Sequence, residues 1–489
     1  MGFSYGSKGI VTDGLVLYFD PTNTRSGVMP SSGNGINNQY PNVMPYPNDA
    51  FSWADGAGAN NCTYERGCGV VDTTITNAGG GELGGYSNGT RATSPVTGTG
   101  TGCEVDIVTD SGQIVELTMS TPGGGYAVDD ILSVVEAGAS DGQFTVGSLN
   151  VDPSPVGNRP LMMLCDGSDP YISTYNSSTW NLATASKAES WDFSVYLKTS
   201  DNNEDNPQLF IFGADSTGDI MYDEPEEDHS KLNVDQPSAT TEWQKFTHGH
   251  TFGSGSDSVK YIQVRVDGDQ VGINPHTMSF DGFDVRKSPT WFDPYTGKEG
   301  ALPGGITFKD GHTVFNGHTT YGVLKDDTEL QITGEISIGT WIKPTLKGDE
   351  YQRVVNKAHG ANGYLGYSMG LRRSTGAFFL AVDGIHEGRG SGGVFYTTPG
   401  DIVADVWQYI VLTADGTNER AYINGAQVME GSDGWTPGTG SNRFEIGQAS
   451  TIDDERFFSG SIDVVQVYDR ALTLSEVQQN YNALKWRFQ

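Results

Sequence analysis

The sequence predicts an all-β protein, and three observations indicate this class. Gly accounts for 66 of the 489 residues, well above the roughly 7% of average usage, and it follows no collagen-like period. Short runs of aromatic and β-branched residues alternate with Gly-rich turns along the chain. The 22 Tyr, 21 Phe and 9 Trp residues are too many for a disordered chain.

The C-terminal part of the chain shows the clearest strands. Residues 336–342 alternate in polarity and run into Lys343-Pro344, where a proline ends the ladder. Residues 420–423 run into Asn424-Gly425, a strong hairpin signal because a type I′ turn needs positive φ at both positions. Further strands are predicted at 378–382, 407–412, 444–447 and 461–468.

A short helix is predicted at the end of the chain. Thr473 is a candidate N-cap and Glu476, three residues later, completes a capping box, while Leu472 and Val477 occupy the staple positions. Helical spacing predicts one apolar face docked on the sheets. Its expected members are Leu474, Val477, Tyr481 and Leu484.

These residues carry a family resemblance. The run from Phe458 to Tyr481 resembles the end of laminin G-type, concanavalin A-like domains, and the segments TWIKP, WQYIVLTADG and AYINGAQV are similar to their central strands. Residues 10–23 and the ending NYNALKWRF resemble a variant frequent in tailed-bacteriophage virion proteins. The resemblance covers about residues 300–489 and implies a concanavalin A-like jelly-roll sandwich.

The first strand of this predicted sandwich lies far from the rest. The segments at 307–308 and 314–317, which normally follow it closely, come almost 300 residues later. We therefore expect a split domain, 1–30 and 290–489, interrupted at an early loop, where an insertion costs little.

The insertion is expected to hold two further β units. Residues 31–70 and 156–289 resemble a carbohydrate-binding-module jelly roll, on the segments FSVYLK and WQKF. Residues 71–155 form a small Gly-rich β module with strands at 103–108 and 114–119 joined by a loop at 110–112. Its Pro122–Leu132 segment resembles an element of small β modules in phage tail and capsid-associated proteins.

No catalytic pattern emerges, so we expect no enzyme. Concanavalin A-like glycosidases place paired carboxylates on one strand, as E-x-D-x-x-E. The nearest run begins at Glu104-Val-Asp106, but Thr109 stands where the second Glu is needed. HExxH and Walker patterns are absent from the sequence. The formal charge of −32 disfavours nucleic-acid binding.

Several aromatic residues are candidates for sugar binding. In Gly-, Pro- or Asn-rich surroundings an aromatic ring either stacks on a pyranose or packs locally. The candidates are Trp53, Trp180, Trp291, Tyr396 and Trp435. Trp191, Trp341 and Trp407 lie within predicted strands and are expected in the core.

The only cofactor that we consider is calcium. The resemblance implies an ion at a loop edge, held by carboxylate and carbonyl oxygens. Asp453 with Asp454, or Asp281 with Asp284, could supply ligands. His248 and His250 would share a strand face, as metal ligands or, more simply, as loop or surface residues.

Four cysteines leave the redox state open. They are Cys62, Cys68, Cys103 and Cys165, and none forms a CxxC pair. Cys62 and Cys68 either bridge or stay free thiols, and synthesis in a cytoplasm favours free thiols.

The leading functional expectation is a bacteriophage virion structural protein, capsid-decorating, tail or fibre-associated, assembled in the host cytoplasm. Other virion proteins, further copies of the chain and a host-surface glycan are its expected partners. Neither a signal-peptide pattern nor an apolar run of membrane-spanning length occurs in this sequence. The alternatives are a carbohydrate-binding adhesin and, less favoured, a glycoside hydrolase.

Overall fold

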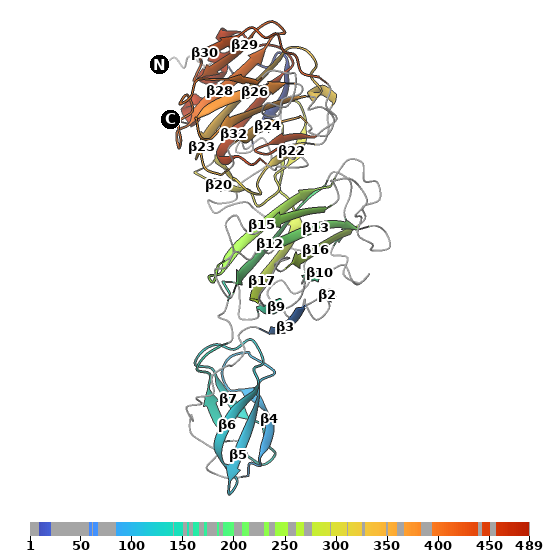
Figure 1. Cartoon of the computed structure of the whole chain (residues 1–489), viewed down its shortest axis with the longest axis vertical. Helices are drawn as coiled ribbons and strands as arrows, with labels where there is room; N and C mark the ends of the chain where they lie inside the picture. Colours follow the sequence, from blue (N-terminus) through green and yellow to red (C-terminus); the bar gives the residue numbers. More distant parts are fainter. Residues whose placement is uncertain are drawn as a thin grey trace, which may run out of the picture.

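A computed structural model describes most of the chain. The described residues are 9–20, 58–60, 62–66, 85–139, 141–149, 154–155, 160–165, 171–173, 183–184, 189–199, 208–214, 229–233, 240–252, 261–267, 276–293, 295–310, 312–324, 328–348, 351–358, 366–382, 394–438, 443–449 and 456–488. Some strand segments, among them 58–60, 62–66 and 394–396, are described by their backbone alone. Figure 1 shows three groups of sheets in a row, with β4–β8 at one end and β1 and β18–β32 at the other.

The terminal sandwich is built from two antiparallel sheets. The first, which we call the helix-covered sheet, contains the following strands in spatial order: β20 (Thr307–Lys309), β21 (His312–Asn316), β32 (Ser459–Tyr468), β23 (Ile336–Pro344), β28 (Gln408–Ala414), β29 (Glu419–Ile423) and β30 (Ala426–Gly431). The N-terminal strand β1 (Leu15–Phe19) also pairs with β32. A strand from residues 15–19 thus completes a sheet whose other strands all lie between residues 307 and 468.

The second sheet of this sandwich is called the opposing sheet. Its strands are β18 (Thr290–Phe292), β19 (Glu299–Ala301), β22 (Gly322–Leu324), β31 (Phe444–Ile446), β24 (Tyr351–Asn356), β25 (Tyr367–Arg372), β26 (Ala377–Val382) and β27 (Val394–Tyr396). One core, including Phe19, Ile338, Met369 and Phe444, fills the space between the sheets. The predicted all-β class and the concanavalin A-like jelly-roll sandwich are confirmed.

The middle sandwich also has two sheets. One contains β14 (His229–Asn233), β13 (Gln208–Ala214), β16 (Tyr261–Asp267), β10 (Tyr171–Ser173), β2 (Gly58–Asn60) and β11 (Ala183–Thr184). The other contains β15 (Gln244–Thr251), β12 (Ser190–Thr199), β17 (His276–Lys287), β9 (Leu161–Cys165) and β3 (Cys62–Arg66). Phe193 and Phe283 stack at 6.2 Å in its interior.

The distal module is a single five-stranded sheet. Its order is β6 (Gln113–Thr121), β5 (Glu104–Asp110), β4 (Gly89–Pro95), β7 (Ile131–Val134) and β8 (Gln143–Thr145). The predicted hairpin joins β5 to β6, and Ser111 and Gly112 both have positive φ there. A Cβ on Gly100 would lie 2.0 Å from the Tyr126 ring, so this glycine lets the tyrosine into the core.

The single α-helix of the described residues, α2 (Leu474–Leu484), follows the predicted capping box at Thr473 and Glu476. A 3-10 turn, η3 (Lys485–Arg487), continues it, and another, η2 (Thr328–Leu330), lies earlier in the chain. The predicted apolar face needs one correction. Leu474 is 42% exposed, whereas Asn480 is fully buried, with its amide bonded to Val11 and Tyr468 between α2 and the sheet.

The middle and terminal sandwiches meet at a close backbone contact. A Cβ on Gly249 of β15 would lie 2.1 Å from the nitrogen of Gly304. The Asp192 carboxylate, on β12, accepts a hydrogen bond from that nitrogen at 2.8 Å. The Arg443 guanidinium donates to the carbonyl of Thr251 at 3.0 Å. We call this region the junction.

Candidate binding surface

The outer face of the helix-covered sheet is closed by the C-terminal residues. Trp341 of β23 stacks on Phe488 with ring centroids 4.2 Å apart, and it lies 5.7 Å from Tyr481 of α2. Val477 and Leu484 pack into the same cluster. Over β23, β28 and β32 this face is therefore an internal packing surface, whereas the edge strand β30 is exposed.

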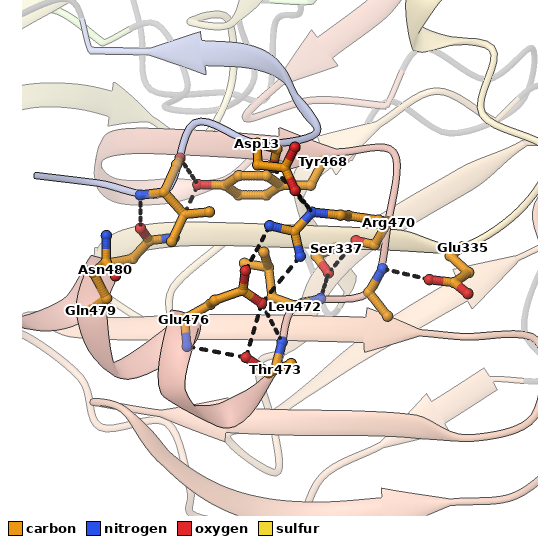
Figure 2. Close-up of polar contacts among 12 residues, drawn as sticks. Asp13, Glu335, Ser337, Tyr468, Arg470, Leu472, Thr473, Glu476, Gln479 and Asn480 are labelled. Atoms are coloured by element: carbon orange, nitrogen blue, oxygen red, sulfur yellow. Dashed lines mark hydrogen bonds and ion pairs between the residues drawn. The ribbon is translucent and has the colours of Figure 1, made fainter.

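Polar contacts fasten the N-terminal segment to the helix, as Figure 2 shows. The backbone N–H of Val11 donates to Asn480 at 2.7 Å, and the Tyr468 hydroxyl donates to the Val11 carbonyl at 3.0 Å. Arg470 pairs with both Asp13 and Glu476. The Arg470 hydrogen bonds lower the pKa of Glu476 to about 2.

A buried ion cluster joins the two ends of the described chain. Arg487 donates to both carboxylate oxygens of Asp20, at 2.7 and 3.0 Å, and to Asp463 at 3.3 Å. His312 lies 2.9 Å from Asp463. Both carboxylates are fully buried, and burial raises the pKa of Asp463 against the opposing effect of His312 and Arg487. This cluster holds β1, β32 and η3 together.

The outer face of the opposing sheet has a different character. The Arg353 guanidinium of β24 lies over the Phe379 ring of β26 at 4.8 Å. Tyr351 has two guanidinium groups over its ring, Arg372 of β25 at 5.6 Å and Arg456 at 5.4 Å. We call these five residues the Arg–aromatic surface. Neither family pattern nor local periodicity indicated it, because its members come from four separate segments.

A glycine allows the central stack of this surface. Gly370 of β25 is paired with Arg353 on one side and with Phe379 on the other. A Cβ on Gly370 would lie 2.6 Å from the Phe379 ring and 2.4 Å from the carbonyl oxygen of Gln352. The missing side chain therefore leaves room for the Phe379 ring next to β25, where the Arg353 guanidinium lies over it.

Polar groups continue the face toward β31. Asn356 donates to the Glu445 carboxylate at 3.3 Å, and Arg443 pairs with the same carboxylate at 3.1 Å. Glu445 is 1% exposed. Arg353 and Arg456 are also buried, while Tyr351 and Arg372 are half-buried and reach solvent. The accessible part of the surface is thus the Tyr351–Arg372 side.

The predicted sugar-binding aromatics fall in different places. Trp291 is 1% exposed and packs edge-on against Phe19 at 5.0 Å. Of the two alternatives, stacking on a sugar or packing locally, the structure shows local packing for this residue. Trp435 is half-buried against the sandwich core, and its backbone N–H donates to the Glu419 carboxylate. The backbone of Tyr396 is paired with Phe379, next to the Arg–aromatic surface. Trp53 and Trp180 lie outside the described residues.

The three tryptophans predicted for the core are not all equally buried. Trp191 and Trp341 are each 2% exposed, which confirms that prediction. Trp407 is half-buried, and its ring lies 4.8 Å from that of Phe488 at the edge of the apolar cluster between α2 and the helix-covered sheet.

Two of the four predicted calcium ligands are described by the structure, and both bond to other groups of the protein. Asp281 is fully buried and accepts hydrogen bonds from the Ser154 hydroxyl at 2.6 Å and from the Gly282 N–H. Asp284 pairs with Arg286. Asp453 and Asp454 lie outside the described residues. Within the described ranges, no group of three or more His, Cys, Asp and Glu side chains converges on a metal position.

The interpretation of His248 and His250 as loop or surface residues is wrong, because both lie buried on β15. His248 and His250 are each 5% exposed and pair with Phe193 and Trp191 of the central strand β12. Gly249, which lies between them, faces Gly304 at the junction, so strand alternation places both histidines on the other face of β15, the face that Phe193 occupies on β12.

Comparison with known proteins identifies the terminal sandwich. Residues 316–478 match the family model of the Concanavalin A-like lectin/glucanases superfamily. The five residues of the Arg–aromatic surface all lie within this stretch. No curated protein sequence matches the chain.

Solved structures with a similar fold include three binding domains or sugar complexes. The binding domain of Paraclostridial Mosquitocidal Protein 1 is 17% identical, with a TM-score of 0.33, over 40% of this chain and 49% of that one. Domain 4 of AbnA, an arabinanase from Geobacillus stearothermophilus in complex with arabinotriose, is 21% identical (TM-score 0.30; 39% and 89% covered). The CBM40 of Ruminococcus gnavus IT-sialidase, bound to alpha2,3 sialyllactose, is 16% identical (TM-score 0.27; 30% and 82%). The chain therefore spans about half the length of the mosquitocidal binding domain.

Among the described residues, no helix has both the length and the apolar character needed to cross a membrane.

Proposed function

We propose that this chain is a virion structural protein of a tailed bacteriophage, on the capsid, the tail or a fibre, which attaches through its terminal sandwich to a glycan. The resemblance of residues 10–23 and of the C-terminal run to phage virion proteins supports the location. Assembly in the host cytoplasm, other virion proteins and further copies of this chain as partners belong to the same proposal.

The arrangement of the units supports a role at a particle surface. The chain leaves the terminal sandwich after β1 and returns to it at β18, so the middle sandwich and the distal module extend from one base (Figure 1). A base that contains both described ends of the chain can be anchored while the other units project from it.

The contrast between the two outer faces carries the attachment role. α2 and Phe488 cover one face with apolar side chains, whereas the other bears the half-buried Arg372 guanidinium over the Tyr351 ring. A guanidinium directs its N–H donors outward in its own plane, which suits the hydroxyl and carboxylate oxygens of a glycan. Glu445 is held by Asn356 and Arg443, which suits positioning rather than proton transfer.

A glycan array with the purified full chain tests the attachment role. We expect binding to a defined glycan set, and Arg372→Gln should weaken the Kd about tenfold, the effect of losing a charge-assisted hydrogen bond. Arg420→Gln is the matched control, because Arg420 lies on β29 of the helix-covered sheet. Retention of full affinity by Arg372→Gln, or no binding to any glycan, contradicts this site.

The virion location has a separate test. Mass spectrometry of purified particles from the phage that carries the gene should detect the chain at structural copy number. Its absence from the particles, with glycan binding intact, would favour the adhesin alternative.

A further inference from the structure

Two cysteines lie at matching positions on the strands that connect the middle sandwich to the distal module. The distal strands β4–β8 come after β3 and before β9 in the chain. β3 and β9 pair antiparallel without a register shift, from Arg66 opposite Leu161 to Cys62 opposite Cys165. The whole distal module is therefore inserted between the two members of one cysteine pair.

The backbone at this pair suits a cross-strand bond. Directly opposite residues in an antiparallel pair have Cα atoms about 4.5–5.5 Å apart, whichever hydrogen-bonding type the pair has. Disulfide bonds span Cα separations of roughly 4.4–6.8 Å. We propose that Cys62 and Cys165 form a disulfide bond across β3 and β9, with glutathione disulfide or an equivalent disulfide as the oxidant.

Chain reach argues against the neighbouring cysteine as the partner. From Cys62 to Arg66 the strand extends over about 13 Å, at roughly 3.3 Å per residue. Two further residues span at most about 7 Å. A bond from Cys62 to Cys68 would thus require a complete reversal of the chain directly after Arg66.

Cys103 is also a poor competitor. It is 1% exposed, in the core of the distal module, and burial raises its thiol pKa to about 11. At neutral pH almost none of it is thiolate, the form that attacks a disulfide. It therefore serves as an internal reference thiol.

The reaction is an ordinary thiol–disulfide exchange. One cysteine thiolate attacks glutathione disulfide, forms a mixed disulfide and releases one glutathione thiolate. The second cysteine thiolate then displaces the other glutathione, and the two protons lost by the cysteines end on the two glutathione thiols. Reducing cytoplasm opposes this exchange, so the bond forms when the chain reaches oxidising surroundings.

The bond would close a loop that contains the entire distal module. Cross-linking a long loop restricts the unfolded chain more than a short one. The disulfide would also keep β3 and β9 together if the backbone hydrogen bonds at the end of this strand pair broke. The two strands that connect the distal module to the middle sandwich would then be covalently linked to each other.

A peptide map tests the proposal on the intact chain. The purified full-length protein is incubated with glutathione disulfide, its remaining thiols are alkylated, and it is digested without reductant. We expect a linked peptide that joins residues 62 and 165 and that dithiothreitol separates. A peptide joining 62 to 68, or alkylation of both Cys62 and Cys165 after the incubation, overturns the proposal.

Paired variants add a second measurement. Cys165→Ser should abolish the linked peptide, whereas Cys68→Ser should leave it unchanged. Oxidation should raise the thermal midpoint of the native chain and of Cys68→Ser by several degrees but not that of Cys165→Ser. An equal rise in all three proteins contradicts the assignment.

Discussion

At the scale of single residues, the loss of Arg487 should destabilise the protein more than the loss of a partly exposed ion-pair residue such as Arg420. Removal of Arg487 leaves Asp20 and Asp463, both fully buried, without their guanidinium partner. Breaking a buried pair in this way typically costs about 3–5 kcal/mol. We expect Arg487→Gln to lower the free energy of unfolding by that amount in urea denaturation followed by Trp fluorescence.

Arg420→Gln provides the control for this prediction. Arg420 pairs with Asp415 and Glu430, but these side chains are 25–48% exposed. Such a pair contributes about 0–1 kcal/mol. Similar small effects of both substitutions would show that the buried cluster does not hold the chain ends.

Asp192 should make stability depend on pH in the opposite sense from most carboxylates. Burial raises its pKa from 3.8 to about 6, although Ser288 and Gly304 donate hydrogen bonds to it. A carboxyl group whose pKa is raised by folding favours the folded state when protonated. Its contribution to the free energy of unfolding therefore increases as pH falls from about 6 to 3.8.

The Asp192→Asn variant isolates this contribution. The difference in unfolding free energy between the native chain and the variant should change by roughly 2–3 kcal/mol between pH 7 and pH 4, in favour of the native chain at low pH. Urea denaturation at a series of pH values measures it. A difference that does not vary with pH would mean that Asp192 keeps an ordinary pKa.

At the scale of elements, the capping box should decide how firmly α2 is held. Thr473→Ala removes the hydroxyl that accepts from the Glu476 N–H, and losing such a cap costs about 1 kcal/mol. Thr473→Ser keeps the hydroxyl and should restore most of the loss. Urea denaturation of the two variants checks this, and equal stability of both would exclude a role for the cap.

The same element should respond to acid. Arg470 lowers the pKa of Glu476 to about 2, so the stabilisation by this carboxylate is complete above the ordinary value of 4.5. It is lost as pH falls from there toward about 2. Glu476→Gln should therefore differ most from the native chain at neutral pH and least near pH 2, measured by the ellipticity of α2 and by thermal midpoints.

At the scale of the whole molecule, Gly249 controls how closely the middle and terminal sandwiches approach. The three atoms nearest to a methyl group there would all be backbone atoms of Pro303 and Gly304, which cannot rotate away. Overpacking of this kind costs about 1–3 kcal/mol. We expect Gly249→Ala to destabilise the junction and to increase the maximum dimension in solution X-ray scattering.

Gly334→Ala is the matched control, because no atom lies within 4 Å of its added Cβ. It should change stability by no more than about 0.5 kcal/mol. If Gly249→Ala behaved in the same way, the close contact between the sandwiches would not persist in solution.

Several features of this protein were predictable from the sequence because they depend on neighbouring residues. The capping box at Thr473 lies within one turn of helix, and the turn at Asn424-Gly425 has positive φ at both residues, as predicted. Alternation with period two placed Trp341 and Trp191 in strands and hence in the core. The all-β class and the jelly-roll sandwich follow from the same local signals.

The tertiary structure alone decided which faces are covered and which residues meet. Proline residues on both sides made Trp291 look like a surface residue, but its indole packs on Phe19 of β1, a strand far away in the sequence. The Arg–aromatic surface joins strands β24, β25 and β26 with Arg456, and Arg487 reaches Asp20. Periodicity shows that a strand or helix has two sides, but the sheet or helix packed against it determines which side is buried.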